Sequence, residues 1–171
     1  MVSRARIIEK MNQLENHIKI KFEDIELLAK AMNSTPLPKL PGDGKHKRSD
    51  CKNTALATVG DAILKAILAD YFFSQSEQPR KGEITREKEK LEKNDVLFAV
   101  MEIDHLKQYT YNDSAFYDDP QEGDKKVSDS KHNQYIEAII AAIYYDKGFN
   151  STKKWVLDYL LPKLEDSSER G

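Results

Sequence analysis

The chain has 171 residues, 39% of them hydrophobic and 33% charged, with a formal net charge of −2 at pH 7. This composition is typical of a globular domain and excludes a disordered chain. No apolar run is long enough to cross a membrane, the N-terminus lacks a secretory pattern, and the single cysteine, Cys51, cannot form an internal disulfide. We therefore expect a cytoplasmic protein without a membrane partner, with one domain over residues 1–164 and a flexible tail at 165–171.

The N-terminal third predicts two short amphipathic helices followed by a long loop. Apolar residues at helical spacing predict the first helix over residues 4–15. Asp24 is a suitable N-cap for the second helix, which begins at Ile25. Residues 35–50 hold three prolines and two glycines, and this composition indicates a loop.

The central helix of the chain is predicted over residues 53–73, because its apolar residues fall on most helical faces. Gly60 and Asp61 break this pattern, since glycine costs about 1 kcal/mol relative to alanine inside a helix and aspartate is a poor helix former. We interpret Gly60 as a point of close approach by another helix, with the Asp61 carboxylate at the crossing. Alternatively, Asp61 forms a polar surface stripe with Thr58 and Lys65.

The second half of the chain predicts more helices, no repeats and no strand pairs, so the fold class is all-α. In chain order, the predicted elements are a charged helix from 85 through 93, a helix that begins at 94 or 95, a loop over 110–131, a helix over 134–146 that ends at Gly148, and a last helix that ends before Pro162.

Glu137 is the only charged residue in the apolar stretch 135–144. An ionised carboxylate in such surroundings pairs with a cation, binds a metal or shifts its pKa. If the two apolar helices cross, Glu137 meets Asp61, and a hard divalent cation such as Mg²⁺ is the natural partner of the two carboxylates. The alternative is a partly solvated carboxylate pair that is bonded to a lysine or a tyrosine.

Charged residues are segregated along the chain. Residues 39–52 carry five basic and two acidic residues, residues 80–93 carry six basic and four acidic residues, and residues 113–124 carry five acids and no base. Such segregation permits a basic face on a slightly acidic protein. The alternative is that these segments are ordinary solvated loops and helix faces.

Four segments, taken in order, resemble the ribonuclease III family. They are the apolar pattern within residues 14–31, LATVGDAIL at 56–64, GEIT at 82–85, and the stretch from Glu137-Ala138 through YYDKGF at 144–149. The resemblance implies a helical endonuclease domain that dimerises through its signature helix, here 53–73. It also implies binding of double-stranded RNA between the subunits and cleavage that depends on Mg²⁺, with Mn²⁺ as a possible substitute. The resemblance is partly to the compact Mini-III branch, so we expect no double-stranded-RNA-binding domain.

The resemblance assigns catalysis and metal binding to Asp61 and Glu137, with Gln134 as a further, neutral ligand. Three positions depart from the family pattern, because Ala57, Gln134 and Lys81 stand where the larger enzymes carry acids. The loss of negative charge should weaken metal affinity. Lys81 either supplies positive charge at the site or contacts phosphate.

The leading hypothesis is a small homodimeric, Mg²⁺-dependent endoribonuclease for double-stranded or structured RNA. We expect RNA phosphates to bind basic residues of the two basic segments, namely Lys45, Lys47, Arg48, Lys81 and Arg86. The rival hypothesis is a catalytically attenuated relative that binds RNA or serves as a structural subunit of a ribonucleoprotein. An unrelated helical interaction module is a third reading.

Overall fold

The computed structural model describes residues 1–47, 49–117 and 134–171. Within these ranges the protein is helical and contains only isolated β-bridges, so the predicted all-α class is confirmed. The elements are α1 (Arg4–His17), α2 (Ile25–Ala31), α3 (Thr54–Ser74), α4 (Lys81–Leu91), α5 (Asn94–Ile103), the 3-10 helix η1 (Leu106–Tyr109), α6 (Tyr135–Lys147), α7 (Phe149–Trp155), the π-helical turn η2 (Val156–Leu160) and α8 (Leu161–Arg170). No helix in the described part of the chain is both long and apolar enough to cross a membrane.

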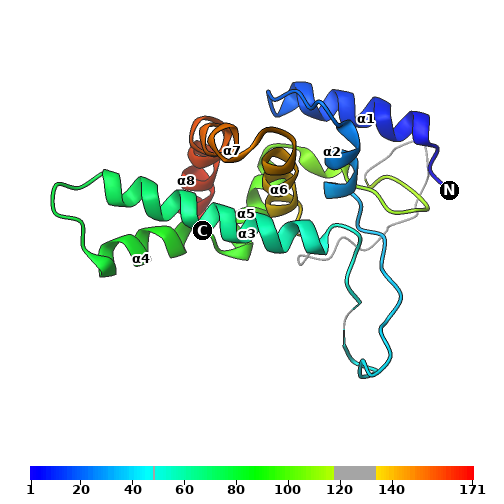
Figure 1. Ribbon diagram of the computed structural model, residues 1–171, viewed down its shortest axis with the longest axis horizontal. Helices are drawn as coiled ribbons and strands as arrows, with labels where there is room; N and C mark the ends of the chain where they lie inside the picture. Colours follow the sequence, from blue (N-terminus) through cyan, green and yellow to red (C-terminus); the bar gives the residue numbers. More distant parts are fainter. Residues whose placement is uncertain (48, 118–133) are drawn as a thin grey trace.

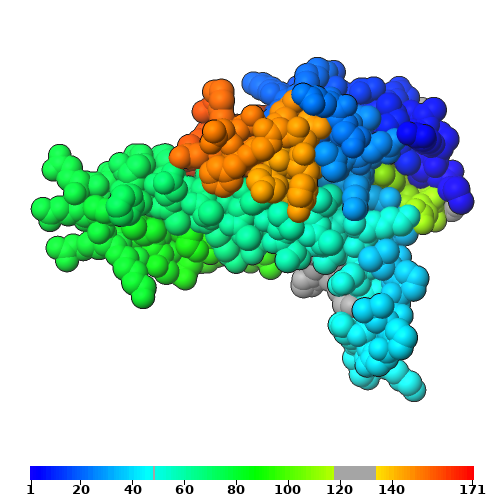
Figure 2. Space-filling view, in the orientation of Figure 1, coloured from blue at the N-terminus to red at the C-terminus, as the bar shows by residue number. Residues whose placement is uncertain are grey.

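Helix α3 forms the long axis of the molecule (Figure 1). Helix α4 folds back beside its C-terminal half, and α6 packs across its middle. The loop between α2 and α3, predicted at 35–50, projects from the other end and stands away from the body of the protein (Figure 2). The two basic segments that the sequence singled out therefore lie at opposite ends of α3.

The predicted helix ends agree with the structure where capping chemistry sets them. The Asp24 side chain accepts a hydrogen bond from the backbone N–H of Glu26 and so begins α2, as expected for an N-cap. Gly148 ends α6 with a φ of 84°, a left-handed value that glycine adopts without strain.

Two predicted boundaries are wrong. Helix α4 begins at Lys81 instead of residue 85, because Gly82 lies in its first turn and does not mark a turn before it. The last helix does not stop before Pro162, since the chain continues from α7 through the π-helical turn into α8. Pro162 lies in the first turn of α8, directly after the π-helical turn, which interrupts the regular i→i−4 hydrogen bonding. The expected tail from residue 165 continues α8 to Arg170, and Ser167 is buried within it.

Asp104, at the C-terminus of α5, connects three parts of the fold. Its carboxylate accepts a hydrogen bond from the Tyr159 hydroxyl in the π-helical turn. The same carboxylate lies 3.4 Å from His17 Nε2 at the end of α1 and 3.5 Å from Lys163 Nζ in α8. These contacts fix the C-terminal segment against the first helix.

The core is centred on α3 and α6. Helix α3 buries one face, made of Leu56, Ala57, Gly60, Leu64, Ile67 and Leu68. Helix α6 is buried at every position from Tyr135 to Ile143. A helix that is apolar on all sides requires neighbours on all sides, and α2, α3 and α7 all contact α6.

Gly60 is the point at which α3 and α6 touch. A Cβ atom at Gly60 would lie 1.7 Å from the carbonyl oxygen of Glu137 and 2.5 Å from its carbonyl carbon. The expectation of a close helix approach at Gly60 is therefore confirmed. Because the obstacle is main chain, no side-chain rotation can relieve such a contact.

We predict that Gly60→Ala lowers the free energy of unfolding by about 3 kcal/mol or more, because α3 and α6 must move apart to admit the methyl group. Gly82→Ala is the matched control, since a Cβ at Gly82 meets no atom within 4 Å. There alanine should instead stabilise α4 by about 0.5 kcal/mol. Urea denaturation of both variants measures the difference, and equal stabilities would contradict the packing described.

Candidate functional site

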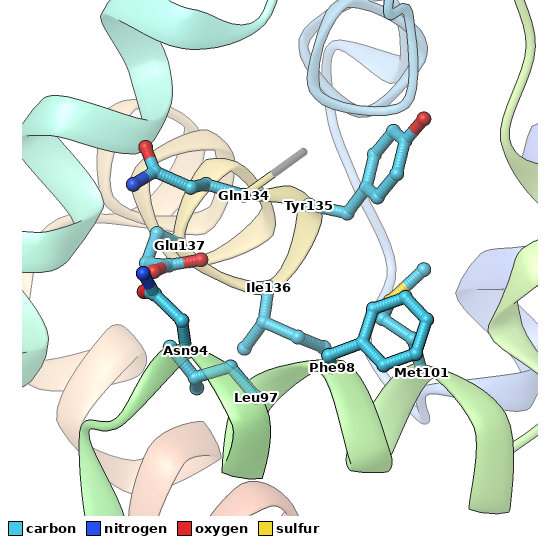
Figure 3. A pocket seen from close by; sticks show the side chains of 8 residues that line it. All are labelled: Asn94, Leu97, Phe98, Met101, Gln134, Tyr135, Ile136 and Glu137. Atoms are coloured by element: carbon cyan, nitrogen blue, oxygen red, sulfur yellow. The ribbon is translucent and has the colours of Figure 1, made fainter. Parts of the chain in front are cut away.

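Glu137 lies in the first turn of α6, directly over the crossing with α3. Only 2% of the residue is exposed. Together with its neighbours on α6 and one face of α5 it lines a small cavity, whose residues are Asn94, Leu97, Phe98, Met101, Gln134, Tyr135, Ile136 and Glu137. Figure 3 shows the polar ends of Asn94, Gln134 and Glu137 gathered on one side of this cavity.

The cavity is polar at one end and apolar at the other. Phe98 and Met101 lie away from the carboxylate of Glu137 (Figure 3). The cavity volume is about 10 Å³, which is about the space that one water molecule or a small cation needs. The site therefore suits an ion or a water next to Glu137 and excludes an organic cofactor.

Burial is the main cause of the unusual protonation of Glu137. Burial and, to a lesser extent, the nearby negative charge of Asp61 raise the pKa of the Glu137 carboxyl from 4.5 to about 7. The backbone N–H of Glu137 and the positive charge of Lys65 act in the opposite direction. The positive charge around Glu137 is thus too small to keep its carboxyl ionised as readily as in water.

Asp61 is on the exposed edge of the same crossing. Its carboxylate is 39% exposed, and its Oδ2 atom lies 2.8 Å from the Nζ atom of Lys65, one turn further along α3. Asp61 also acts electrostatically on Glu137. The structure therefore brings together the two carboxylates that the sequence singled out, and it also contains the Asp61–Lys65 pair of the alternative reading.

The three positions that depart from the family pattern have different environments. Ala57 is fully buried on the inner face of α3. Gln134 is exposed where α6 begins and lines the Glu137 cavity. Lys81 is the first residue of α4 and is exposed. Lys65 is the basic residue that hydrogen-bonds to Asp61 and interacts electrostatically with Glu137.

Sequence reasoning missed two contributors to the site. Asn94 was recognised only as a helix start, although it lines the cavity opposite Gln134. Glu92, at the C-terminus of α4, acts electrostatically on Lys65 and is paired with Lys88 at 2.9 Å. Both come from chain segments with no local anomaly, so only the tertiary fold reveals them.

The oxygen donors at this crossing fit a weakly held hard cation. Asp61 and Glu137 supply carboxylates, while Asn94 and Gln134 supply amide oxygens, and these are the ligand types that Mg²⁺ takes. In the described part of the chain, no three His, Cys, Asp or Glu side chains group closely enough to hold a metal ion by themselves. Water molecules would have to complete the coordination of a cation here.

The basic residues that were expected to bind RNA occupy two separate surfaces. Lys45 and Lys47 lie on the projecting loop, where Lys47 pairs with Asp43 at 2.6 Å. Lys81 and Arg86 are exposed on α4, where Arg86 pairs with Glu87 at 3.2 Å. Arg48 lies outside the described residues.

Solved structures share this arrangement of helices. The nuclease domain of ribonuclease III from Campylobacter jejuni superposes with a TM-score of 0.64 at 20% sequence identity, over 94% of this chain and 97% of that one. A crystal structure of the same domain gives a TM-score of 0.62 at 22% identity, over 93% of this chain and 94% of that one. These likenesses confirm the predicted ribonuclease III nuclease-domain fold.

Sequence comparison gives the family. Ribonuclease 3 of Clostridium tetani is 25% identical over 147 residues, and that of Clostridium acetobutylicum is 28% identical over 147 residues. Each match covers 86% of this chain and 58% or 60% of the relative, so the chain spans about three fifths of the length of these proteins. Residues 43–164 match the model of the ribonuclease-III-like family, and the chain belongs to that family.

We predict that Glu137 makes stability fall as pH rises from about 4.5 to about 7 in metal-free buffer. In this window the unfolded carboxyl has lost its proton while the folded one, with its pKa raised to about 7, keeps it. The loss is about 3 kcal/mol at most and is complete above pH 7. Glu137→Gln should abolish this slope and be more stable than the wild type at pH 8.

Urea denaturation in EDTA at pH 5, 6, 7 and 8 measures this slope. Glu89→Gln is the control, because Glu89 is exposed on α4 and the same substitution there should leave the pH dependence unchanged. A Glu137→Gln variant with the wild-type slope would show that Glu137 titrates alike in the folded and unfolded protein, and would contradict the raised pKa.

Proposed function

We propose that the protein is a Mg²⁺-dependent endoribonuclease that cleaves double-stranded or structured RNA as a homodimer. The observation that supports this most directly is the buried Glu137 carboxylate, which lies beside Asp61 at the Gly60 crossing. A fold does not need two interacting acids at its most tightly packed point for stability. Their retention is explained if a cation and a reaction use them.

In the proposed mechanism, Asp61 and Glu137 would hold the cation, and Gln134 and Asn94 would offer amide oxygens from the same side of the cavity as Glu137. When bound, Mg²⁺ would supply a hydroxide for attack on phosphorus and stabilise the departing 3′ oxygen. Burial against α5 limits the rotamers of Glu137, and the contact at Gly60 fixes its main chain relative to Asp61. The chain thus presents preorganised carboxylates and needs no nucleophile of its own.

The outer face of α3 supports the proposed dimer. Its residues at intervals of three and four positions are apolar and at least partly exposed, and they are Ala55, Val59, Ala62, Ala66, Ala69 and Phe73. Small side chains allow two helices to approach closely, and an apolar strip of this length is suited to an interface. The Campylobacter jejuni nuclease domain has a region involved in dimer formation.

A twofold dimer about α3 would also combine the two basic surfaces. Helix α3 has 21 residues, which corresponds to a length of roughly 30 Å, so the projecting loop and α4 of one subunit are far apart. If the two α3 helices run antiparallel, the loop of one subunit lies at the same end as α4 of the other. The pair would form a longer basic surface for a duplex backbone.

The second candidate function is RNA binding without cleavage, as a structural subunit. It is favoured by the fully buried Ala57 and by the neutral Gln134, because each leaves the site with one carboxylate fewer than the family pattern. Incubation of labelled double-stranded RNA with and without Mg²⁺ separates the two functions. Fragments that form only with Mg²⁺ support the enzyme, whereas retained but uncleaved RNA supports the binder.

We predict that Asp61→Asn and Glu137→Gln each lower the cleavage rate by at least roughly a hundredfold, because each removes a negative ligand of the catalytic cation. Asp70→Asn is the control, since Asp70 is also on α3 but pairs with Lys153 on α7 at 2.6 Å. It should cleave like the wild type. Single-turnover cleavage measures the rate, and a filter-binding assay checks that the variants still bind RNA. A wild-type rate in either the Asp61 or the Glu137 variant would refute the assignment of that residue as a ligand of the catalytic cation.

We predict a dimer at micromolar concentration that Ala62→Glu converts to a monomer, because a twofold contact would bring two new charges together in an apolar interface. Ala5→Glu makes the same change at an exposed position of α1 and should leave the dimer intact. Sedimentation velocity distinguishes the states. A monomeric wild type, or a dimeric Ala62→Glu variant, would show that this face of α3 is not the interface.

A further inference from the structure

Lys65 donates a hydrogen bond to one of the two carboxylate oxygens of Asp61. Its Nζ atom lies 2.8 Å from Asp61 Oδ2, and the two side chains are 46% and 39% exposed. An ammonium group that donates to a carboxylate oxygen uses a lone pair that the oxygen would otherwise present to a metal. The contact is therefore made to the carboxylate that the proposed function assigns to the cation.

The charge of Lys65 also acts on acids from two other helices. The hydrogen bond that Lys65 donates to Asp61 raises the pKa of Lys65 against the opposing effect of burial, and the charges of Asp61, Glu92 and Glu137 also raise it. One ammonium group thus has carboxylates from α3, the end of α4 and α6 around it. A divalent cation bound at this crossing would experience the same carboxylates.

The pair contributes little to stability. Exposed ion pairs one helical turn apart add little to helix stability, because both side chains remain well hydrated. A contact of this strength is easily broken, and the flexible, half-exposed lysine stem can move its charge into solvent without unfolding any helix. The Lys65 ammonium group is therefore held at Asp61 reversibly.

Resting on the proposed function, we propose that Lys65 is a built-in counter-cation of the carboxylate site: it neutralises Asp61 when no metal is bound and competes with a divalent cation for the same carboxylate. Lys65 is thus a regulatory residue that raises the metal concentration at which the site fills. It acts through Asp61 and touches neither substrate nor reacting atoms.

Lys65, and not Lys81, then supplies the positive charge at the site. Lys65 contacts Asp61 directly and also lowers the pKa of Glu137, whereas Lys81 is at the exposed start of α4. The site carries fewer acids than the family pattern and in addition carries a resident cation. Because of both features, we expect the metal site to fill only at a high concentration of the divalent cation.

The test measures Mn²⁺ binding by isothermal titration calorimetry to the full chain, without RNA. Lys65→Met removes the charge and keeps the length of the side chain, and Lys65→Gln removes the charge with a polar replacement. Lys65→Arg keeps the charge and is the matched control. We expect a Kd for Mn²⁺ that is roughly tenfold lower in the Met and Gln variants, because a unit charge near the ion is removed. The Arg variant should bind like the wild type.

Each outcome decides one of the two proposals. Tighter binding by the Met and Gln variants but not by Arg supports the competition. Equal affinity in all four proteins refutes the role of Lys65 and leaves the metal site intact. Absence of Mn²⁺ binding in every protein refutes the metal site itself, and with it both the proposed function and the competition. Circular dichroism in EDTA confirms that each variant is folded.

Discussion

The contact between the main chains of α3 and α6 at Gly60 and Glu137 determines the rest of the structure. Without a side chain at Gly60, the two central helices approach until main chain meets main chain. That approach buries Glu137, places it near Asp61 and raises the pKa of Glu137 to about 7. Packing and electrostatics at the site therefore have one geometric cause, since a wider crossing would admit water and relax both effects.

The most informative residues in the sequence were those that contradicted their surroundings. Gly60, Asp61 and Glu137 are poor choices for apolar helices, and the structure places all three at one crossing. Local inconsistency of this kind marks places where packing or chemistry overrides helix propensity. By contrast, Asn94 and Glu92 are unremarkable in their own helices, so their proximity to the site follows only from how α4, α5 and α6 pack.

The errors in the predicted helix boundaries have a similar origin. The predicted limits at residue 85 and before Pro162 assume that Gly82 and Pro162 break helices, because each residue type opposes helix formation inside a helix. Gly82 lies in the first turn of α4, and Pro162 follows directly on the π-helical turn, where the regular i→i−4 hydrogen bonding is already interrupted. Whether such a residue ends a helix depends on its position within the helix, and composition alone does not give that position.

The π-helical turn at Val156–Leu160 has a consequence for the register of the C-terminal segment. Such a turn accommodates one residue more than an α-helical turn, and each residue of an α-helix advances the side chains by about 100°. The turn therefore absorbs one residue, and the helix after it keeps the direction that places Leu164 and Ser167 in the interior. Deleting a single residue within the turn would restore a regular helix with this face still buried, whereas a deletion in α8 before Leu164 would rotate the face by about 100°.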